Sequence, residues 1–589
     1  MRIPASLRLR ALAPKVARWA LLLWGLRFLE LLALDAFGGK QKLWLFQKLD
    51  AHRFTAMAML LGKLRLSSAL SRLDYDQEVF NGAVYTHWGL GVPLMQLPFH
   101  AVSRWRHAGV FPDRAIYFFY FAALVPLLWA AFDRLLATRE GPGALAVRRH
   151  ALSFSATALL LVCGFFPLMS CRFLIYEETV AYFMVVEFAA LAAYVFALRR
   201  GGDLAVYWIG VAAGLGLLIR PTGLVYAGVW AALLLLERPK RRTMITFVGA
   251  AAPFVVFWAY SNWVRTGSLV STGLANSVPW SDFHTPMLRF GSFCDDTPRH
   301  TASVAKRLLE GFFVTTGGEQ ASWLDKCHFV FEERPGSPPH EAFFGVGVFV
   351  AIAWMLLHQL ARRERRLALY VPHATIVVLF GAYVWAGASF AWRYIGDFWP
   401  AFALAGVQYV RFLPPAASPL LGFRTALVLC ACSYSAYGHE IEPSIPTLET
   451  GDPSRVPKLW SELTEALEAT DPALPSRLEC GKVPNWPIHD GQGWSSNCAV
   501  STFTNFYVGV PQKSDDHYQL RFHTSAMSAG SVRVYVNGRV YLARRSGDDY
   551  AAEVAIPSKR LVSPIVMATI EWVDGVDAPP GKLLSIELV

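Results

Sequence analysis

The chain has 589 residues, of which 54% are hydrophobic and 17% are charged, against about 45–50% and about 25% in an ordinary soluble protein. This excess of apolar side chains excludes a single soluble domain and predicts a polytopic membrane protein. The net charge of +11 does not indicate a nucleic-acid partner, because the basic residues lie in short stretches between the hydrophobic segments, as in the cytoplasmic loops of membrane proteins.

The first apolar run follows a basic N-terminus. Arg2, Arg8, Arg10, Lys15 and Arg18 resemble the charged region of a signal peptide, but no small-residue cleavage site follows them. We therefore expect an uncleaved first helix with the N-terminus in the cytoplasm.

Further apolar segments follow along the chain. Five of them lack Asp, Glu, Lys and Arg and approach the ~20 residues that a bilayer requires: Ala115 to Phe132, Ala151 to Cys171, Thr243 to Val264, Ala342 to Ala361 and Leu367 to Trp392. Weaker spans, which are shorter or contain charges, are Trp19 to Leu34, Thr179 to Leu198, Leu204 to Ile219, Thr222 to Leu236, Phe398 to Val410 and Thr425 to Tyr437. The sequence thus predicts about eleven transmembrane helices.

Basic residues set the predicted orientation. After the N-terminus they cluster at 134–149, 199–200, 238–242, 362–366 and 411–424. The short loops of the opposite side carry only Arg172, Arg220 and Arg393. By the positive-inside rule the first set is cytoplasmic, and an odd number of spans places the C-terminus outside.

Two long outer loops, 35–113 and 265–341, follow from this topology. The first contains two semi-apolar stretches, His52 to Leu66 and Trp88 to Val102, which we expect to form helices that lie on the membrane surface. If 89–102 crossed the membrane instead, every later basic loop would face outward, and we reject that interpretation for this reason.

The chain changes character after residue 437. Alternating apolar residues in Tyr518–Phe522, Ser531–Val536 and Val566–Trp572 predict strands. Asn537-Gly538 is typical of a type I′ hairpin turn, whose two central residues need positive φ. We therefore divide the chain into a transmembrane domain, 1–437, and an extracytoplasmic β-sandwich domain of jelly-roll type, 438–589.

The cysteines agree with this topology. Cys294 and Cys327 share the second outer loop, and Cys480 and Cys498 share the C-terminal region. We predict a disulfide within each pair, with free structural cysteines as the alternative. No CxxC pair or His/Cys cluster has the spacing of a zinc site.

Carboxylates at the outer edge of a membrane domain are candidates for catalysis, because ionisable groups are costly there. Asp50 lies in the first outer loop, and Glu177 and Glu178 occupy a short outer turn. One carboxylate would act as general base for an acceptor hydroxyl, and a second would orient the acceptor or hold a metal. The alternatives are helix capping for Asp50 and a favourable helix-dipole interaction for the two glutamates.

Arg220 and Arg393 lie on the same side, where positive charge is otherwise scarce. Arginine binds phosphate through paired, charge-assisted hydrogen bonds, so these two residues suit a lipid-phosphate group. Snorkelling at the membrane edge is the alternative.

Aromatic residues of the first outer loop are candidates for substrate contacts. Tyr85, His87 and Trp88 would stack on a sugar, although such residues also form a belt at the membrane surface. His52 joins them as a candidate substrate contact, and as a metal ligand it lacks an evident partner in the sequence.

The metal requirement is left open. Asp74, Asp76 and Glu78 favour a solvated loop face over a metal site. The candidate cofactor is a divalent cation, Mg²⁺, Mn²⁺ or Ca²⁺, and its ligands are unknown.

Five passages in this order resemble the GT-C superfamily of integral-membrane glycosyltransferases, which use polyprenyl-phosphate sugars. The likeness is to the bacterial branch related to protein mannosyltransferases and to aminoarabinose and arabinose transferases. The passages are Leu49–Ala58, Phe80–Phe99, Tyr176–Glu178, Ile219–Gly223 and the segment from Arg393 to Pro400. A sixth, Asn262–Gly267, resembles a recurrent family stretch more faintly.

The resemblance implies roles for particular residues. It implies Asp50 as the catalytic base, Glu177 or Glu178 as the second acid, and Arg220 and Arg393 as phosphate ligands. The family often has a lone acid at the second position, so the two adjacent glutamates leave that assignment open.

The activity implied is that of an inverting glycosyltransferase in the bacterial inner membrane. It would move a sugar from a polyprenyl-phosphate donor to an extracytoplasmic glycan, lipid or protein acceptor in cell-envelope biosynthesis, surrounded by membrane lipids. The C-terminal region resembles the carbohydrate-binding β-domains attached to some members. The alternatives are a transporter or flippase of lipid-linked sugars, for which the sequence shows neither clear charges near the bilayer midplane nor clear paired repeats, and a non-enzymatic glycan-binding membrane protein.

Overall fold

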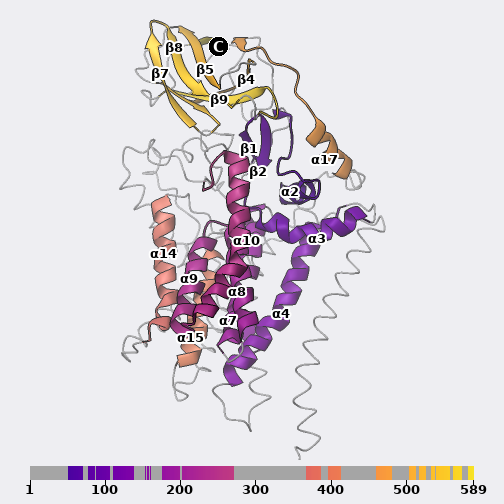
Figure 1. Ribbon diagram of the computed structural model, residues 1–589, viewed down its shortest axis with the longest axis vertical. Helices are drawn as coiled ribbons and strands as arrows, with labels where there is room; N and C mark the ends of the chain where they lie inside the picture. Colours follow the sequence, from indigo (N-terminus) through magenta and orange to yellow (C-terminus); the bar gives the residue numbers. More distant parts are fainter. Residues whose placement is uncertain are drawn as a thin grey trace, which may run out of the picture. The chain divides into compact units, whose positions relative to one another are not determined.

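The chain forms two compact units (Figure 1). The computed structural model describes residues 51–70, 77–86, 88–105, 110–137, 153, 156–157, 160, 175–198, 202–270, 366–386, 396–412, 459–480, 503–511, 516–525, 532–537, 539–557, 561–572 and 582–589. The first unit contains the described residues of 89–257 and 366–412, and the second contains those of 51–88, 258–270 and 459–589. The predicted domain boundary at 437/438 lies outside the described residues and stays a prediction.

The described part of the first unit is helical. Uninterrupted apolar sequence favours helices in an apolar environment, because a helix satisfies its backbone hydrogen bonds within its own segment. The elements are α3 (Gly91–Trp105), α4 (Asp113–Ala137), α7 (Ile175–Ala197), α8 (Asp203–Ile219), α9 (Gly223–Glu237), most of α10 (Arg241–Thr266), the 3-10 turn η5 (Leu367–Leu369), α14 (Val371–Ala386) and α15 (Trp399–Phe412).

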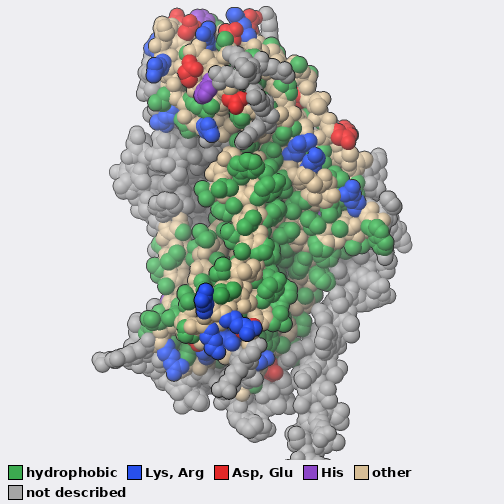
Figure 2. Space-filling view, in the orientation of Figure 1, with side chains coloured by type: hydrophobic (Ala, Val, Ile, Leu, Met, Phe, Trp, Pro, Cys, Tyr) green, Lys and Arg blue, Asp and Glu red, His purple; other side chains and the backbone are tan. Residues whose placement is uncertain are grey.

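Helix α7 is the centre of this unit, and α4, α8 and α15 pack on it. In its apolar window 89% of the residues are buried, against 17% in that of α10. The apolar side chains of α10 therefore face outward, among them Ile245, Val248 and Val256, and apolar side chains cover most of the helical face seen in Figure 2. Such a surface suits lipid and not water.

Among the described residues, α4, α7 from Glu178 onward and α10 are long and apolar enough to cross a membrane. They coincide with three predicted spans, and α8, α9, α14 and α15 coincide with four more. The predicted interfacial segments of the first loop are helical in part, as α2 (Ala51–Leu60) and α3. The other four predicted spans fall mostly or wholly outside the described residues, so the number eleven stays a prediction.

The second unit is mostly β, which confirms the expectation for the C-terminal region. Among its described residues, eight antiparallel strands form one sheet in the order β3-β10-β5-β8-β7-β6-β9-β4. They are β3 (Arg477–Glu479), β4 (Phe503–Gly509), β5 (His517–Ser525), β6 (Val532–Val536), β7 (Arg539–Ser546), β8 (Asp549–Ala555), β9 (Ile565–Trp572) and β10 (Lys582–Leu588). Strands β5, β6 and β9 coincide with the three strands predicted from alternation.

Strand β7 joins two halves of this sheet, since it pairs with β6 through its first residues and with β8 through its last. One half has the order β3-β10-β5-β8 and the other β7-β6-β9-β4, which is the strand order of a jelly roll. Inward residues of both halves, such as Phe522 and Val534, form one core. Helix α17 (Leu459–Glu468) precedes the strands and was not predicted.

Two Asn-Gly turns lie in the second unit. The predicted hairpin at Asn537 is confirmed, because Asn537 has φ 48° and β6 pairs with β7. An identical signal at Asn81-Gly82 was missed: it joins β1 (Gln77–Phe80) to β2 (Ala83–Thr86), with φ 49° and 72°. The two turns meet, because the Asn81 backbone N–H donates to Oδ1 of Asn537 at 3.3 Å.

Gly82 offers a test of this contact. A Cβ at Gly82 would overlap the backbone of Ser563, and its φ of 72° is left-handed. Gly62, at φ 70°, has no described atom within 4 Å of such a Cβ. We expect Gly62→Ala to cost about 1 kcal/mol through backbone strain alone, and Gly82→Ala to cost clearly more. Thermal unfolding of the purified variants measures this, and equal decreases in Tm would contradict the contact.

Candidate functional site

A buried carboxylate lies at the start of α7. Nε2 of Gln96 on α3 donates a hydrogen bond of 2.8 Å to Oε1 of Glu178. Both side chains are fully buried. Gln96 belongs to the passage Phe80–Phe99 and Glu178 to Tyr176–Glu178, so this bond joins two of the passages that carry the family resemblance.

Charged groups at the start of α4 surround this carboxylate. Asp113 and Arg114 are 1% and 8% exposed, and Arg114 interacts electrostatically with both Asp113 and Glu178. Tyr182, one turn further along α7, is also buried and interacts electrostatically with Glu178. Because these side chains are buried, their electrostatic interactions are stronger than they would be in water. The cluster therefore holds an acid and a guanidinium together.

The turn between α8 and α9 places Arg220. Because Pro221 follows, the residue before it is restricted to extended backbone, and Arg220 ends α8 with φ −146° and ψ 147°. Its Nε and Nη2 donate to Oδ2 of Asp397 at 3.2 and 2.9 Å. The Tyr226 hydroxyl donates to the Asp397 carbonyl. Two further passages, Ile219–Gly223 and the segment from Arg393 to Pro400, thus meet through a buried ion pair.

The passage Phe80–Phe99 also touches this turn. The backbone of Gly89 lies so close to the Leu218 and Ile219 carbonyl groups that a Cβ at position 89 would overlap them. Only glycine permits this approach of two backbones. Within the first unit, one network of contacts therefore links four of the passages.

In the second unit, Arg265 joins the sixth passage to the second. Its Nη1 donates to the carbonyl oxygens of Thr86 and Trp88, both at 2.9 Å, and its Nη2 donates to Oδ1 of Asn262 at 3.0 Å. Three acceptors around one buried guanidinium fix the chain that leads out of β2. This segment contains Trp88, whose ring meets the His52 ring edge-on at 6.2 Å.

Glu78 corrects one expectation. It was expected on a solvated loop face, but on β1 it is fully buried opposite Tyr85, and neither carboxylate oxygen has a hydrogen-bond partner among the described residues. Burial raises the pKa of Glu78 from 4.5 to about 8, although the nearby Arg265 opposes the shift. Burial also raises the pKa of Tyr85 to about 12.

The raised pKa makes the stability depend on pH. The folded chain binds the Glu78 proton more tightly than the unfolded chain does, so this stabilisation is complete below about pH 4.5 and is lost as the pH rises through about 8. We expect Glu78→Gln to flatten the decrease in Tm over that interval. The exposed Glu465→Gln on α17 removes one negative charge as a control and should keep the wild-type slope. Parallel profiles for Glu78→Gln and wild type would contradict the burial of Glu78.

Several predicted site residues lie outside the described residues: Asp50, His87, Arg393, Cys294, Cys327 and Cys498. Glu177 lies in the first turn of α7, but its side chain is not described. Cys480 is disulfide-bonded, with a partner outside the described residues, so its pairing with Cys498 stays a prediction. Within the described part of the chain, no group of three His, Cys, Asp or Glu side chains could hold a metal ion.

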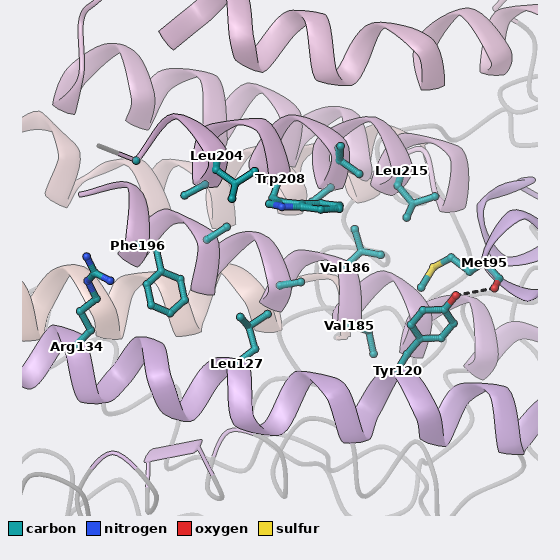
Figure 3. A pocket seen from close by; sticks show the side chains of 16 residues that line it. Met95, Tyr120, Leu127, Arg134, Val185, Val186, Phe196, Leu204, Trp208 and Leu215 are labelled. Carbon is teal, nitrogen blue, oxygen red and sulfur yellow. Dashed lines mark hydrogen bonds between the residues drawn. The ribbon is translucent and has the colours of Figure 1, made fainter. Parts of the chain in front are cut away.

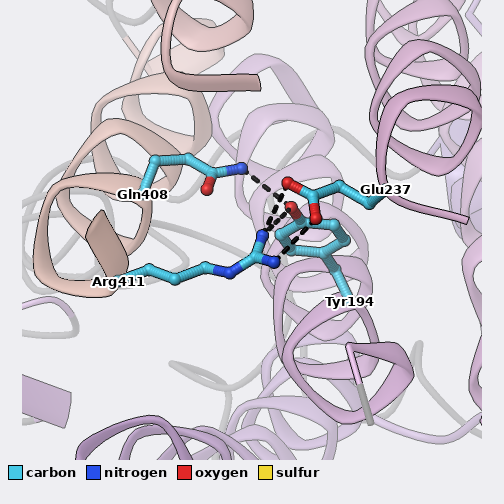
Figure 4. A network of polar contacts seen from close by, with 4 residues as sticks. All are labelled: Tyr194, Glu237, Gln408 and Arg411. Carbon is cyan, nitrogen blue, oxygen red and sulfur yellow. Dashed lines mark hydrogen bonds and ion pairs between the residues drawn. The ribbon is translucent and has the colours of Figure 1, made fainter. Parts of the chain in front are cut away.

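A second polar network lies near the opposite end of α7 (Figure 4). Nη1 and Nη2 of Arg411 donate to the two oxygens of Glu237 at 2.7 and 2.6 Å. The Tyr194 hydroxyl accepts from Gln408 at 2.8 Å and from Arg411 at 3.3 Å. These bonds fasten α7, α9 and α15 together, so both ends of α7 are tied by polar side chains.

Sequence reasoning missed Gln96, Arg114 and Arg265 as site residues. Each is a polar residue within or beside an apolar helix, where a polar group needs a partner. That signal was present in the sequence, but the sequence does not reveal the partner.

A double-mutant cycle can measure the interaction between Arg220 and Asp397. Either Arg220→Gln or Asp397→Asn leaves a buried charge uncompensated and should cost about 3–5 kcal/mol. The double variant should cost less than the sum. Arg242→Gln, which breaks the exposed pair with Asp203, serves as control and should cost below about 1 kcal/mol. Thermal unfolding measures all four, and additive losses would contradict a direct pair.

Comparison with known proteins gives a likeness in structure but none in sequence. No family model matches the sequence, and no curated protein matches it. The structure is similar to the crystal structure of the Archaeoglobus fulgidus oligosaccharyltransferase in the apo form, with a TM-score of 0.36 and 12% sequence identity. The likeness covers 72% of this chain and 56% of that one, so the chain spans little more than half of that enzyme's length. At this level it assigns neither family nor activity.

Proposed function

We propose that the protein is a membrane glycosyltransferase that uses a polyprenyl-phosphate sugar and acts on the extracytoplasmic face. The observation that carries this proposal is the set of contacts between passages far apart in sequence: Gln96 with Glu178, Gly89 with Ile219, and Arg220 with Asp397. Each of these passages resembles a stretch of GT-C enzymes. A site built from these passages requires them to be neighbours, and these contacts support the proposal by joining four of the passages in one network.

Glu178 is the better of the two candidates for the second acid. It is held by Gln96 and lies beside Arg114, so its carboxylate is oriented and electrostatically supported. In the proposed reaction, Asp50 accepts the proton of an acceptor hydroxyl, whose oxygen attacks the anomeric carbon from the face opposite the phosphate. The sugar–phosphate bond breaks, and polyprenyl phosphate leaves with the electron pair.

Two arginines remain candidates for the leaving phosphate. Asp397 fixes the orientation of the Arg220 guanidinium through Nε and Nη2. Arg393 lies four positions before Asp397, within the same passage. We propose that both contribute positive charge to the departing phosphate.

The test is transfer from radiolabelled polyprenyl-phosphate sugars to endogenous acceptors in membranes with matched expression. We expect Glu178→Gln and Asp50→Asn each to lower transfer by about 10²-fold or more, because both substitutions keep the size of the side chain and remove the carboxylate. Glu177→Gln is the matched control one residue away and should retain most activity. A loss with Glu177→Gln but not with Glu178→Gln would reverse the assignment, and consumption of no donor would overturn the proposed activity.

One observation favours a second candidate, a transporter of lipid-linked sugars. Glu187 is fully buried halfway along α7 and accepts a hydrogen bond of 2.8 Å from Nε1 of Trp230. A carboxylate at such a depth is typical of transport pathways. If membranes moved a lipid-linked sugar without transferring it, and Glu187→Gln stopped that movement, the transporter would be the better description.

A further inference from the structure

An apolar groove of about 660 Å³ runs along α7 between α4 and α8 (Figure 3). Helix α4 contributes Tyr120, Leu127 and Arg134, which recur at every seventh position and therefore lie on one face. On α7 the groove is lined by Ala189 and Ala193, whose small side chains leave the space that larger residues would fill.

One end of the groove is apolar and aromatic, and the other is cationic. Met95 and Tyr120 lie at the first end, and Arg134 lies beside Phe196 at the second. The Arg134 guanidinium is 5.3 Å from the centre of the Phe196 ring, which holds it at the groove. Nη1 of Arg238 lies against Gly202, another lining residue, and is buried without a hydrogen-bond partner among the described residues.

The carboxylates at this end do not cancel its positive charge. Asp203 pairs with Arg242 at 3.3 Å, and Glu237 pairs with Arg411 at 2.6 Å. Asp133 is the remaining acid of these helices near Arg134. Among the residues that the structure describes, six basic ones stand against these three acids: Arg134, Arg238, Lys240, Arg241, Arg242 and Arg411. Figure 2 shows Lys and Arg side chains gathered below the apolar face. The groove thus ends in a surplus of positive charge.

The groove is longer than the hydrocarbon part of one leaflet is deep, so it has room for an acyl chain. The stretch of α4 from Tyr120 to Arg134 is about 21 Å long at 1.5 Å per residue. One leaflet supplies about half of the ~30 Å hydrocarbon thickness, so an acyl chain that enters beside Arg134 can lie along the groove within it.

We propose that the groove binds an anionic glycerophospholipid of the cytoplasmic leaflet. One acyl chain lies on α7 between α4 and α8, and the phosphate and headgroup are held by Arg134 and Arg238. This site is distinct from that of the sugar donor, whose phosphate belongs with Arg220 at the other end of α8. The proposal does not depend on glycosyl transfer.

The test uses the full chain in lipid nanodiscs that contain trace photoactivatable phosphatidylglycerol or phosphatidylcholine, each with a diazirine on its acyl chain. Labelled peptides are mapped by mass spectrometry. We expect phosphatidylglycerol to label the α7 and α8 residues of the groove at least roughly five-fold more than phosphatidylcholine, because each arginine near an anionic headgroup contributes about that factor and the site holds two arginines.

Variants locate the effect. The double variant Arg134→Gln with Arg238→Gln should bring the two lipids to equal labelling. Lys240→Gln with Arg241→Gln removes the same charge from exposed positions of the same end and should keep the preference. Ala189→Trp should reduce labelling of the groove by both lipids, because the indole fills it.

Equal labelling by the two lipids in the wild type would overturn the proposal, and this comparison needs no variant to fold. Unchanged preference in the arginine double variant would overturn it as well. Labelling of the groove by a photoactivatable polyprenyl phosphate, with none by phosphatidylglycerol, would assign the groove to the donor and reject a phospholipid site.

Discussion

The helices of the first unit depend on one constraint: a charge inside an apolar helical assembly must be met by a partner from another helix. The pair of Arg220 and Asp397 shows this most directly, because Asp397 is fully buried and both donors come from the end of α8. An isolated carboxylate in such surroundings is strongly disfavoured. The ion pair therefore fixes the position of the chain before α15 against the α8–α9 turn. Apolar contacts alone would not fix this position.

The same constraint explains why α7 is the central helix. It carries Glu178 near its start, Glu187 in its middle and Tyr194 near its end, and each receives a hydrogen bond from a different element: α3, α9 and α15. Three polar contacts at three depths fix both the rotation and the height of α7 against its neighbours. The cluster around Glu178 thus lies on a helix whose position is fixed by its neighbours, as the proposed role of Glu178 requires.

Much of the fold could be predicted from sequence, because hydrophobic periodicity and length report burial in lipid or in a core. The helices α4, α7, α8, α9, α10 and α15 and the strands β5, β6 and β9 coincide with predicted segments. Helix α17 was missed although Leu459, Leu463 and Leu467 recur at helical spacing, because it has only ten residues. The hairpin at Asn81-Gly82 was missed because its flanking strands have only four residues each, too few for alternation to be seen.

The site was less predictable, since a sequence names polar residues but not their partners. The sequence analysis named Glu178 and Arg220 as candidates, yet nothing in the sequence pairs Arg220 with Asp397, which lies 177 positions away. Glu78 was misjudged for a similar reason. Three acids within five positions usually indicate a solvated loop, and only the pairing of β1 with β2 turns Glu78 inward opposite Tyr85.

The C-terminal β region has a structural role that is independent of any ligand: it supports the hairpin of β1 and β2. A two-stranded hairpin of four-residue strands is not stable alone in water, yet β1 and β2 lead directly to Thr86 and Trp88, which Arg265 fixes through their carbonyl groups. The hairpin is supported at its tip: the Val562 backbone N–H donates to the Asn81 carbonyl at 2.8 Å, and Asn537 bonds to Asn81. Its side is covered by a small core that includes Val79, Val84, Tyr507 and Ile565. The jelly roll thus supports the conformation of residues 77–86. These contacts explain why this segment and residues near the C-terminus form one compact unit although they are more than 450 positions apart.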